Sequence, residues 1–281
     1  MNSLPPSFPP ERFHGRPHVN EPGVVTGKQP VRHEVPRGRV ADPLLEFAVH
    51  SGAATMAKPV AGHANQDRYV NDPVHRVYAV FDGIGGDREG GEAAQAAAEY
   101  IHNATIRGNL GTLAVSRTVD LQDVMYAQAR VLQGTNTYLE GIDGGTTATL
   151  AEVVESENQI FAVWSSIGDS RIYRHRLADF KMQQLSRDEG TENVLAKYLK
   201  YDAPAQRSSI IQYHIERLTD GDGLILVTDG VTGDRGYDLM EPHELERHYL
   251  EGVTPTEAAI NLVRNARKID DRTAVVVHIG D

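Results

Sequence analysis

The sequence contains no cysteine among its 281 residues. This absence excludes disulfide frameworks, thiolate zinc sites and cysteine nucleophiles, so any metal site has to use aspartate, glutamate, histidine or backbone oxygen. Basic residues are also scarce, because 28 lysines and arginines stand against 39 acidic residues and give a formal net charge of −11. Nucleic-acid backbones and anionic membranes are bound by clustered basic side chains, so neither is an expected partner.

Long apolar runs are missing as well. No stretch approaches the roughly 20 apolar residues that a spanning helix requires, and the N-terminus lacks the basic-then-apolar order of a signal peptide. We therefore expect a cytoplasmic protein. With 40% hydrophobic and 24% charged residues, the chain is long enough to bury the core of one α/β domain.

Proline is unevenly distributed along the chain. Nine of the fourteen prolines lie between Pro5 and Pro43, where apolar periodicity is almost lacking. We interpret residues 1–43 as a flexible tail, with a docking peptide as the alternative, and residues 44–281 as one domain because no second linker follows.

Short runs rich in β-branched residues predict eight strands, and three amphipathic stretches predict helices. The predicted strands are 45–51, 76–81, 146–154, 159–165, 171–175, 210–218, 224–228 and 273–279, and the predicted helices are 89–107, 121–140 and 255–268. The first two helices share a short connector and should pack antiparallel. This order predicts a β-sandwich flanked by helices.

Aspartates stand at the ends of three predicted strands. Asp82 and Asp229 each follow an apolar run and precede a glycine, and the pair Asp270-Asp271 comes just before a third run. Three converging carboxylates would raise one another's pKa values, whereas divalent cations would compensate them. Gly83 permits a close backbone approach, so its carbonyl is a further oxygen ligand for Mg²⁺ or Mn²⁺. The alternative for each Asp-Gly pair is a turn that caps a helix.

Two further acidic residues lie in short polar segments. Asp67 belongs to Asn65-Gln66-Asp67, and Asp169 lies between two predicted strands in Gly168-Asp169-Ser170-Arg171. Each segment by itself is typical of a turn. Together with the strand-end aspartates they make a set of candidate metal ligands.

Taken in order, these segments resemble the sequence blocks of the protein phosphatase 2C family. The resemblance covers the chain from about residue 45 to the C-terminus, and seven blocks in the family's order make chance agreement unlikely. The blocks are Asn65-Gln66-Asp67, Asp82-Gly83-Ile84-Gly85-Gly86, Gly91-Glu92-Ala93-Ala94, Gly145-Thr146-Thr147, Gly168-Asp169-Ser170-Arg171, Thr228-Asp229-Gly230 and Asp270-Asp271-Arg272-Thr273.

The resemblance implies an α/β (α+β) fold, namely an αββα four-layer sandwich of two antiparallel sheets flanked by helix pairs. It also implies two Mn²⁺ or Mg²⁺ ions in a cleft at one end of the sheets. When the roles of the family's motif residues are transferred to the matching positions, Asp82 bridges the two ions and Gly83 adds its carbonyl to one of them. Asp229 and Asp270 hold the other ion. Asp67 acts through bound water, and Asp169 holds a weaker third ion.

The implied activity is hydrolysis of phosphoserine and phosphothreonine in proteins by a metal-bound hydroxide that attacks phosphorus in line. Asp82, Asp229 and Asp270 are then the catalytic residues, through metal-bound water. The expected partner is a phosphorylated protein, in bacterial signalling that opposes a serine/threonine kinase.

The sequence departs from the family pattern near the expected phosphate site. Gly62 stands where many relatives carry an arginine that binds the substrate phosphate, and Lys58 and His63 are the candidate substitutes. Ile84 stands where some relatives carry a histidine proposed as general acid. Water or another group would then protonate the leaving alcohol.

Two more departures concern the third ion and the flap that relatives carry beside the active site. Gly233 stands where many bacterial members have an acidic residue, with Asp234 next to it, and the stretch 188–193 leaves little room for a flap. A short flap predicts fewer substrate contacts.

Two other functions stay open at this point. A catalytically weak phosphatase-like module would bind and regulate a phosphoprotein partner, and the missing arginine favours it. The retained Asp82, Asp229 and Asp270 favour the enzyme, since a binding module has no use for carboxylates that cations must compensate. A different two-metal hydrolase, acting on a small phosphoester, is the third candidate; the absence of a P-loop argues against nucleotides. Trp164 is expected in the core.

Overall fold

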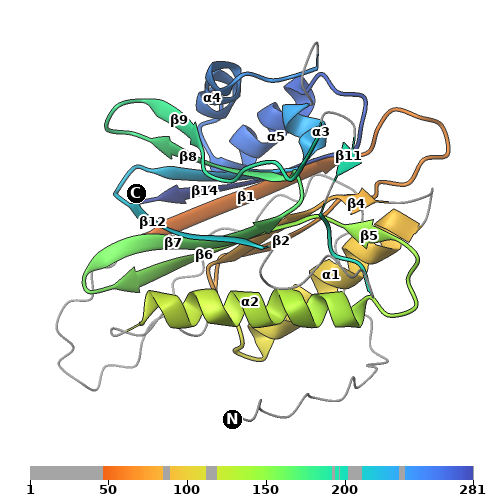
Figure 1. Cartoon of the computed structure of the whole chain (residues 1–281). Helices are drawn as coiled ribbons and strands as arrows, with labels where there is room; N and C mark the ends of the chain where they lie inside the picture. The colour runs from red at the N-terminus through yellow and green to blue at the C-terminus, as the bar shows by residue number, and fades with distance from the viewer. Residues whose placement is uncertain are drawn as a thin grey trace, which may run out of the picture.

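The computed structural model describes residues 47–84, 89–111, 119–191, 194–195, 197–201, 211–233 and 238–280. The predicted tail 1–43, together with Gly85, Gly86 and Asp234 of the motifs, lies outside these residues. Two five-stranded antiparallel sheets stack face to face, and helices cover both outer faces (Figure 1). The predicted αββα sandwich is therefore confirmed.

Each sheet combines strands that are far apart in the sequence. The first sheet has the order β1 (Val49–Met56), β14 (Arg272–Ile279), β13 (Gly223–Val227), β8 (Arg171–Arg176) and β9 (Lys181–Gln184). The second has the order β12 (Gln212–Leu218), β7 (Gln159–Ile167), β6 (Ala148–Ser156), β3 (Val77–Phe81) and β2 (Arg68–Asp72). Two short ladders pair β4 (Gly83–Ile84) with β5 (Gly145–Thr146) and β10 (Gly190–Thr191) with β11 (Val194–Leu195).

The helices divide between the two outer faces. The helix α1 (Glu89–Ile106) and the helix α2 (Leu121–Tyr138) cover the second sheet, whereas α4 (Pro242–Leu250) and α5 (Pro255–Asn265) cover the first (Figure 1). A single-turn helix, α3 (Asp229–Thr232), follows β13. None of the helices in the described ranges is both long and apolar enough to cross a bilayer.

The central strands are buried on both faces, and their side chains alternate between two core layers. In β3, Val77, Ala79 and Phe81 pack toward α1 and α2, while Tyr78 and Val80 pack between the sheets. Such strands appear in the sequence as continuous apolar runs instead of an alternating pattern. The expected core residue Trp164 also lies between the sheets with 3% of its surface exposed.

The first strand lies further along the chain than the sequence pattern predicted. The prediction was 45–51, and the structure has β1 at Val49–Met56. The strand continues through small residues because α5 packs directly on it, and a Cβ at Gly52 would overlap the backbone of Thr256. The small residues that this close helix–sheet contact requires resemble the sequence of a loop, and for that reason the strand prediction ended too early.

Several regular elements were not predicted, among them the strands β2 and β9 and the helix α4, besides the very short β4, β10, β11 and α3. β2 and β9 are the edge strands of the two sheets, and their polar sequences reflect the partial exposure that an edge allows. The helix α4 begins with Pro242 at its first position, and Glu241 and Glu244 form a capping box. That combination is a helix-start signal which the strand-and-helix prediction had missed.

Candidate metal centre

The ends of several strands meet at one end of the sandwich, where β4, β5 and α3 gather (Figure 1). Thr228, between β13 and α3, holds three of these segments together. Its N–H donates to the Thr273 carbonyl at 3.1 Å, its Oγ1 accepts from the Thr273 N–H at 3.0 Å, and its hydroxyl donates to Oδ2 of Asp67 at 2.8 Å. Thr228 thereby fixes Asp67 beside the start of α3, which carries Asp229.

The predicted block Gly145-Thr146-Thr147 holds the backbone of Asp82. The Asp82 N–H donates to Oγ1 of Thr147 at 2.9 Å, and the Asp82 carbonyl accepts from the Thr146 hydroxyl and from the Thr147 N–H, each at 2.9 Å. The Thr147 and Ser170 hydroxyls lie 2.7 Å apart. These contacts connect the segment of Asp82 to the loop that carries Asp169.

Both Asp-Gly pairs need glycine for space. A Cβ on Gly83 would come within 2.5 Å of the backbone carbonyl of Gly90, at the start of α1, and a Cβ on Gly230 would overlap the carbonyl oxygen of Asp271. Neither glycine has a positive φ. The glycines therefore serve the close approach of segments, and not an unusual turn.

Burial and mutual repulsion raise the pKa values of three aspartates at this end, Asp67, Asp82 and Asp169. Burial raises the pKa of Asp67 to about 8, opposed by its hydrogen bond from Thr228 and reinforced by repulsion from Asp271 and Asp229. Burial also raises the pKa of Asp82 well above its usual range, with repulsion from Asp67 and Asp229 adding to it. For Asp169, burial and then Asp229 raise the pKa to about 7. The structure thus brings Asp67, Asp82, Asp169 and Asp229 into one electrostatic cluster.

Two oxygens in this cluster are buried without compensation. Oδ1 of Asp67 and Oδ1 of Asp229 have no hydrogen-bond partner in the described part of the chain. A buried, unpaired carboxylate oxygen is costly unless a cation or donor satisfies it. The donors are carboxylate and backbone oxygens, which are the ligands that Mg²⁺ and Mn²⁺ prefer, so the chemistry of the set fits divalent cations.

The described acidic side chains do not surround a single cation position. In the ranges that the structure describes, no three acidic or histidine side chains are grouped so that they could hold one ion together. The ammonium of Lys268 forms an ion pair with Oδ2 of Asp229 and another, at 3.1 Å, with Oδ2 of Asp270. Sequence reasoning missed Lys268, although a lysine two positions before a candidate ligand was a visible signal.

Asp271 is a second residue whose role was not predicted. It is 5% exposed and accepts the N–H groups of Lys58 at 2.8 Å and Gln66 at 2.7 Å. Nε2 of His63 lies 2.8 Å from both of its carboxylate oxygens. The structure therefore places His63, a predicted phosphate ligand, against Asp271, where it anchors the loop before Asp67. Lys58 reaches the same end through its backbone.

Two described contacts join the segment after β9, where the sequence predicts a short flap at 188–193, to neighbouring strands. Asp188 pairs with Arg171 through two hydrogen bonds of 2.9 and 2.6 Å. Further along, the backbone of Leu199 exchanges hydrogen bonds of 2.7 and 2.9 Å with Thr146, beside Gly83 in the β4–β5 ladder. The predicted shortening concerns residues that lie partly outside the described ranges, so it stays a prediction.

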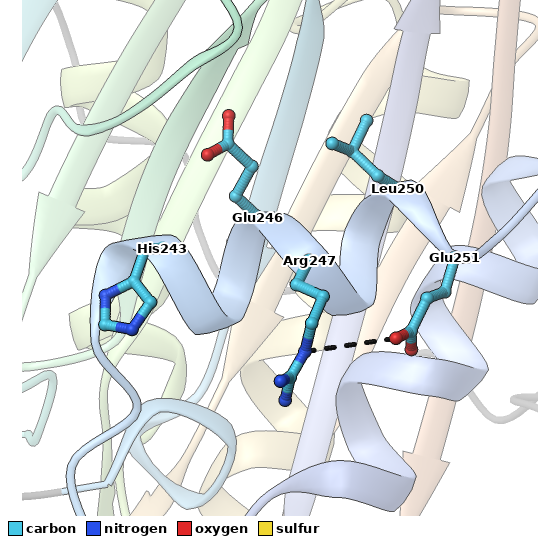
Figure 2. A pocket seen from close by; sticks show the side chains of 5 residues that line it. All are labelled: His243, Glu246, Arg247, Leu250 and Glu251. Carbon is cyan, nitrogen blue, oxygen red and sulfur yellow. Dashed lines mark ion pairs between the residues drawn. The ribbon is translucent and has the colours of Figure 1, made fainter.

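A surface hollow elsewhere has no part in this site. It measures about 400 Å³ and lies on the outer side of α4, lined by His243, Glu246, Arg247, Leu250 and Glu251 (Figure 2). Arg247 and Glu251 form an ion pair of 3.9 Å across it. None of the clustered aspartates lines this hollow, so it lies apart from the candidate metal centre.

Comparison with known proteins identifies a family model and solved structures that match this chain. The family model described as protein phosphatase 2C matches residues 58–265. Solved structures with the same fold include the PPM Ser-Thr phosphatase MsPP of Mycobacterium smegmatis, in complex with cacodylate, at 22% identity and a TM-score of 0.61, covering 82% of this chain and 98% of that one. PppA of Pseudomonas aeruginosa, a regulatory component of its type VI secretion system, is 19% identical at a TM-score of 0.59, with 82% and 97% covered.

The catalytic domain of the serine/threonine protein phosphatase PstP, in complex with two manganese ions, is 19% identical at a TM-score of 0.60, with 84% of this chain and 100% of that chain covered. No curated protein matches the sequence. At these identities the solved structures establish the shared fold.

Fold and site define a four-layer sandwich with an acidic cluster at one end of its sheets. Because the family model matches most of its length, the chain belongs to the protein phosphatase 2C family of protein serine/threonine phosphatases.

Proposed function

We propose that this chain hydrolyses phosphoserine and phosphothreonine in proteins with two Mn²⁺ or Mg²⁺ ions held by the acidic cluster, and that it opposes a serine/threonine kinase in bacterial signalling. When bound, such ions supply a nucleophilic water at neutral pH and neutralise the phosphoryl oxygens. The observation that carries the proposal is the cluster of aspartates from separate strand ends, of which Asp67 and Asp229 are buried and each keep one oxygen without a partner among the described residues.

The residues divide the task according to where the fold holds them. Asp82, whose backbone is held by Thr146 and Thr147, would bind both ions, and the carbonyl of Gly83, close to the start of α1, would add an oxygen ligand. Asp229 and Asp270 would hold the second ion, and Asp67, fixed by Thr228, would act through water. Asp169 would hold a weaker third ion, and its place in the same cluster supports this role.

Substrate binding relies on fewer positive charges than in many relatives. Gly62 offers no side chain where they have arginine. Lys58 is our candidate for the phosphate contact, because its backbone is tied to Asp271 beside the cluster. His63 is assigned to holding the loop, since its Nε2 is engaged by Asp271. A single flexible ammonium binds phosphate less specifically than a bidentate guanidinium, so we expect a high KM.

The test is hydrolysis of p-nitrophenyl phosphate and of a phosphothreonine peptide by the purified protein, with Mn²⁺, with Mg²⁺ and with EDTA. Metal-dependent release of phosphate from both substrates is the expected result. Asp222→Asn is a matched control for substitutions in the cluster, because Asp222 is a buried aspartate paired with Arg174 and belongs to no candidate site.

The second candidate function is the phosphatase-like binding module. The ion pairs of Lys268 with Asp229 and Asp270 favour it, because they partly satisfy the carboxylates without a divalent ion. No release of phosphate with either metal, together with tight binding of an intact phosphopeptide, would establish the module and overturn the enzyme.

A further inference from the structure

Lys268 is a basic side chain whose ammonium forms ion pairs with two of the proposed metal ligands, Asp229 and Asp270. It lies just after α5, and only 17% of its side chain is exposed. Its carbonyl accepts hydrogen bonds from Nε and Nη2 of Arg272, at 3.1 and 2.8 Å. The backbone of Lys268 is therefore held in place, and from this position its ammonium reaches Asp229 and Asp270.

The ammonium uses oxygen atoms that a divalent ion would need. It contacts Oδ2 of Asp229 and Oδ2 of Asp270, the two residues proposed to hold one of the ions. A carboxylate oxygen that ligates a cation at full strength has little left to offer an ammonium, and two positive charges a few ångströms apart repel strongly in a partly buried site. The lysine and the ion therefore compete for the same pair of ligands.

We propose that Lys268 sets the metal affinity of this site: an ion that binds Asp229 and Asp270 has to displace the Lys268 ammonium from their oxygens. This inference rests on the proposed function, because it takes these two residues as ligands. It implies that the two ions bind unequally, and that the one held by Asp229 and Asp270 binds more weakly than the one at Asp82 and Gly83. It also explains how buried carboxylates are partly compensated before an ion enters.

The decisive variant is Lys268→Met, which keeps a long unbranched side chain and removes the charge. Titration calorimetry at fixed pH and salt should show that the Mn²⁺ affinity of the weaker site rises about tenfold or more, which corresponds to roughly 1.4 kcal/mol of binding free energy. Lys268→Arg keeps the charge and should leave the affinity within about threefold of the wild type.

A matched control removes a lysine of the same kind outside the cluster. Lys197 pairs with Glu189 at 2.8 Å, and Lys197→Met removes one positive charge from the chain, as Lys268→Met does. Its Mn²⁺ affinity should equal that of the wild type. A further check is Lys268→Met in an Asp270→Asn background, where the tightening should shrink because one of the shared oxygens is gone.

Thermal melting gives a second readout that does not depend on turnover. In EDTA, Lys268→Met should melt below the wild type, since the carboxylates lose their internal cation, and saturating Mn²⁺ should raise its melting temperature by more than it raises that of the wild type. If Lys268→Met does not fold in EDTA, Lys268→Gln gives the same comparison, and folding of either variant only with Mn²⁺ supports the inference.

The outcomes separate this inference from the function on which it rests. Unchanged or weaker Mn²⁺ binding in Lys268→Met, or equal tightening in Lys197→Met, overturns the role of Lys268 and leaves the phosphatase intact. No Mn²⁺ binding by the wild type overturns the proposed function, and the inference with it.

Discussion

Buried carboxylates occur in two regions of this molecule, and the two regions treat them in opposite ways. Within β6, Glu152 is 1% exposed, and its two oxygens accept from the Gly111 N–H at 2.6 Å and from Nε2 of Gln128 at 3.0 Å. At the strand ends, Asp67 and Asp229 each keep one buried oxygen for which the described part of the chain offers no partner. All three residues are buried carboxylates, so the two regions differ in the hydrogen-bond donors that surround the carboxylate oxygens.

The comparison separates carboxylates that support the fold from carboxylates that are available to a ligand. A satisfied buried group stabilises one arrangement of the chain, whereas an unsatisfied one lowers stability until a cation binds. Asp222 belongs to the first kind, because Arg174 and the N–H of Thr219 satisfy it at 2.6 and 2.8 Å. Removing a carboxylate should therefore have opposite consequences in the two regions.

The largest expected effect is on turnover. Asp82→Asn and Asp229→Asn should each lower the rate with Mn²⁺ by about a thousandfold or more, because each removes a charge that holds an ion without changing volume. In EDTA, Asp82→Asn should melt at or above the wild-type temperature, since it removes a carboxyl group that repels Asp67 and Asp229. Asp229→Asn removes the same repulsion but also gives up the ion pair with Lys268, so its melting temperature should rise less or fall. Rates on p-nitrophenyl phosphate and melting curves test this. Activity that survives both substitutions would remove the basis of the two-metal site.

The opposite result is expected for Asp222→Asn. Among the described residues, the variant leaves Arg174, whose side chain is 11% exposed, with Glu216 at 2.5 Å as its charged partner, and it should lose about 3 kcal/mol of unfolding free energy. Urea denaturation measures the loss, and the rate per folded molecule should match that of the wild type. A stability equal to the wild type, or a loss of activity in the folded protein, would erase the distinction between the two regions.

Glu152 should make stability depend on pH. Burial raises the pKa of Glu152 from 4.5 to about 7, with hydrogen bonds from Gly111 and Gln128 opposing the rise. The folded state therefore favours the protonated carboxyl group of Glu152. The contribution of this group to the unfolding free energy is fully present below pH 4.5 and is lost as the pH rises through 7, so the unfolding free energy falls by up to about 3 kcal/mol.

Glu152→Gln removes this titration and keeps one acceptor oxygen, at a cost on the order of 1 kcal/mol for the other hydrogen bond. Unfolding free energies of both proteins from pH 4.5 to 8, measured in the same buffer series, isolate Glu152 from the aspartates of the cluster, which are present in both. If the difference between the two proteins is constant over this range, Glu152 is not the group that titrates.

The smallest effect concerns the threonine that joins the strand ends. Thr228→Val removes the hydroxyl that donates to Asp67 and accepts from Thr273, and should cost about 1–2 kcal/mol and weaken Mn²⁺ binding several-fold. Thr232→Val is the matched control on the same helix α3, because the buried hydroxyl of Thr232 has no partner among the described residues. It should leave both unfolding free energy and calorimetric Mn²⁺ affinity unchanged or slightly raised.

Much of the fold follows from local patterns in the sequence. The apolar runs at 224–228 and 273–279 become β13 and β14, each within a residue of the predicted bounds, because a strand buried on both faces has to be apolar throughout. The helix at 255–268 begins where predicted, at Pro255 with its capping box, but ends at Asn265. Polar edge strands and a highly charged helix carry weaker signals, and these were the elements that prediction missed.

The sequence by itself determined the layers of the sandwich, the order of the motifs and the candidate acidic ligands, since these depend on residue type and on near neighbours in the chain. Only the tertiary structure decided that Thr228 bonds Asp67 across 161 positions, that Asp271 binds the backbone of Lys58 across 213, and that Lys268 lies between Asp229 and Asp270. The reason is physical: burial and charge at a strand end depend on which distant segments pack there, and no local pattern records that packing.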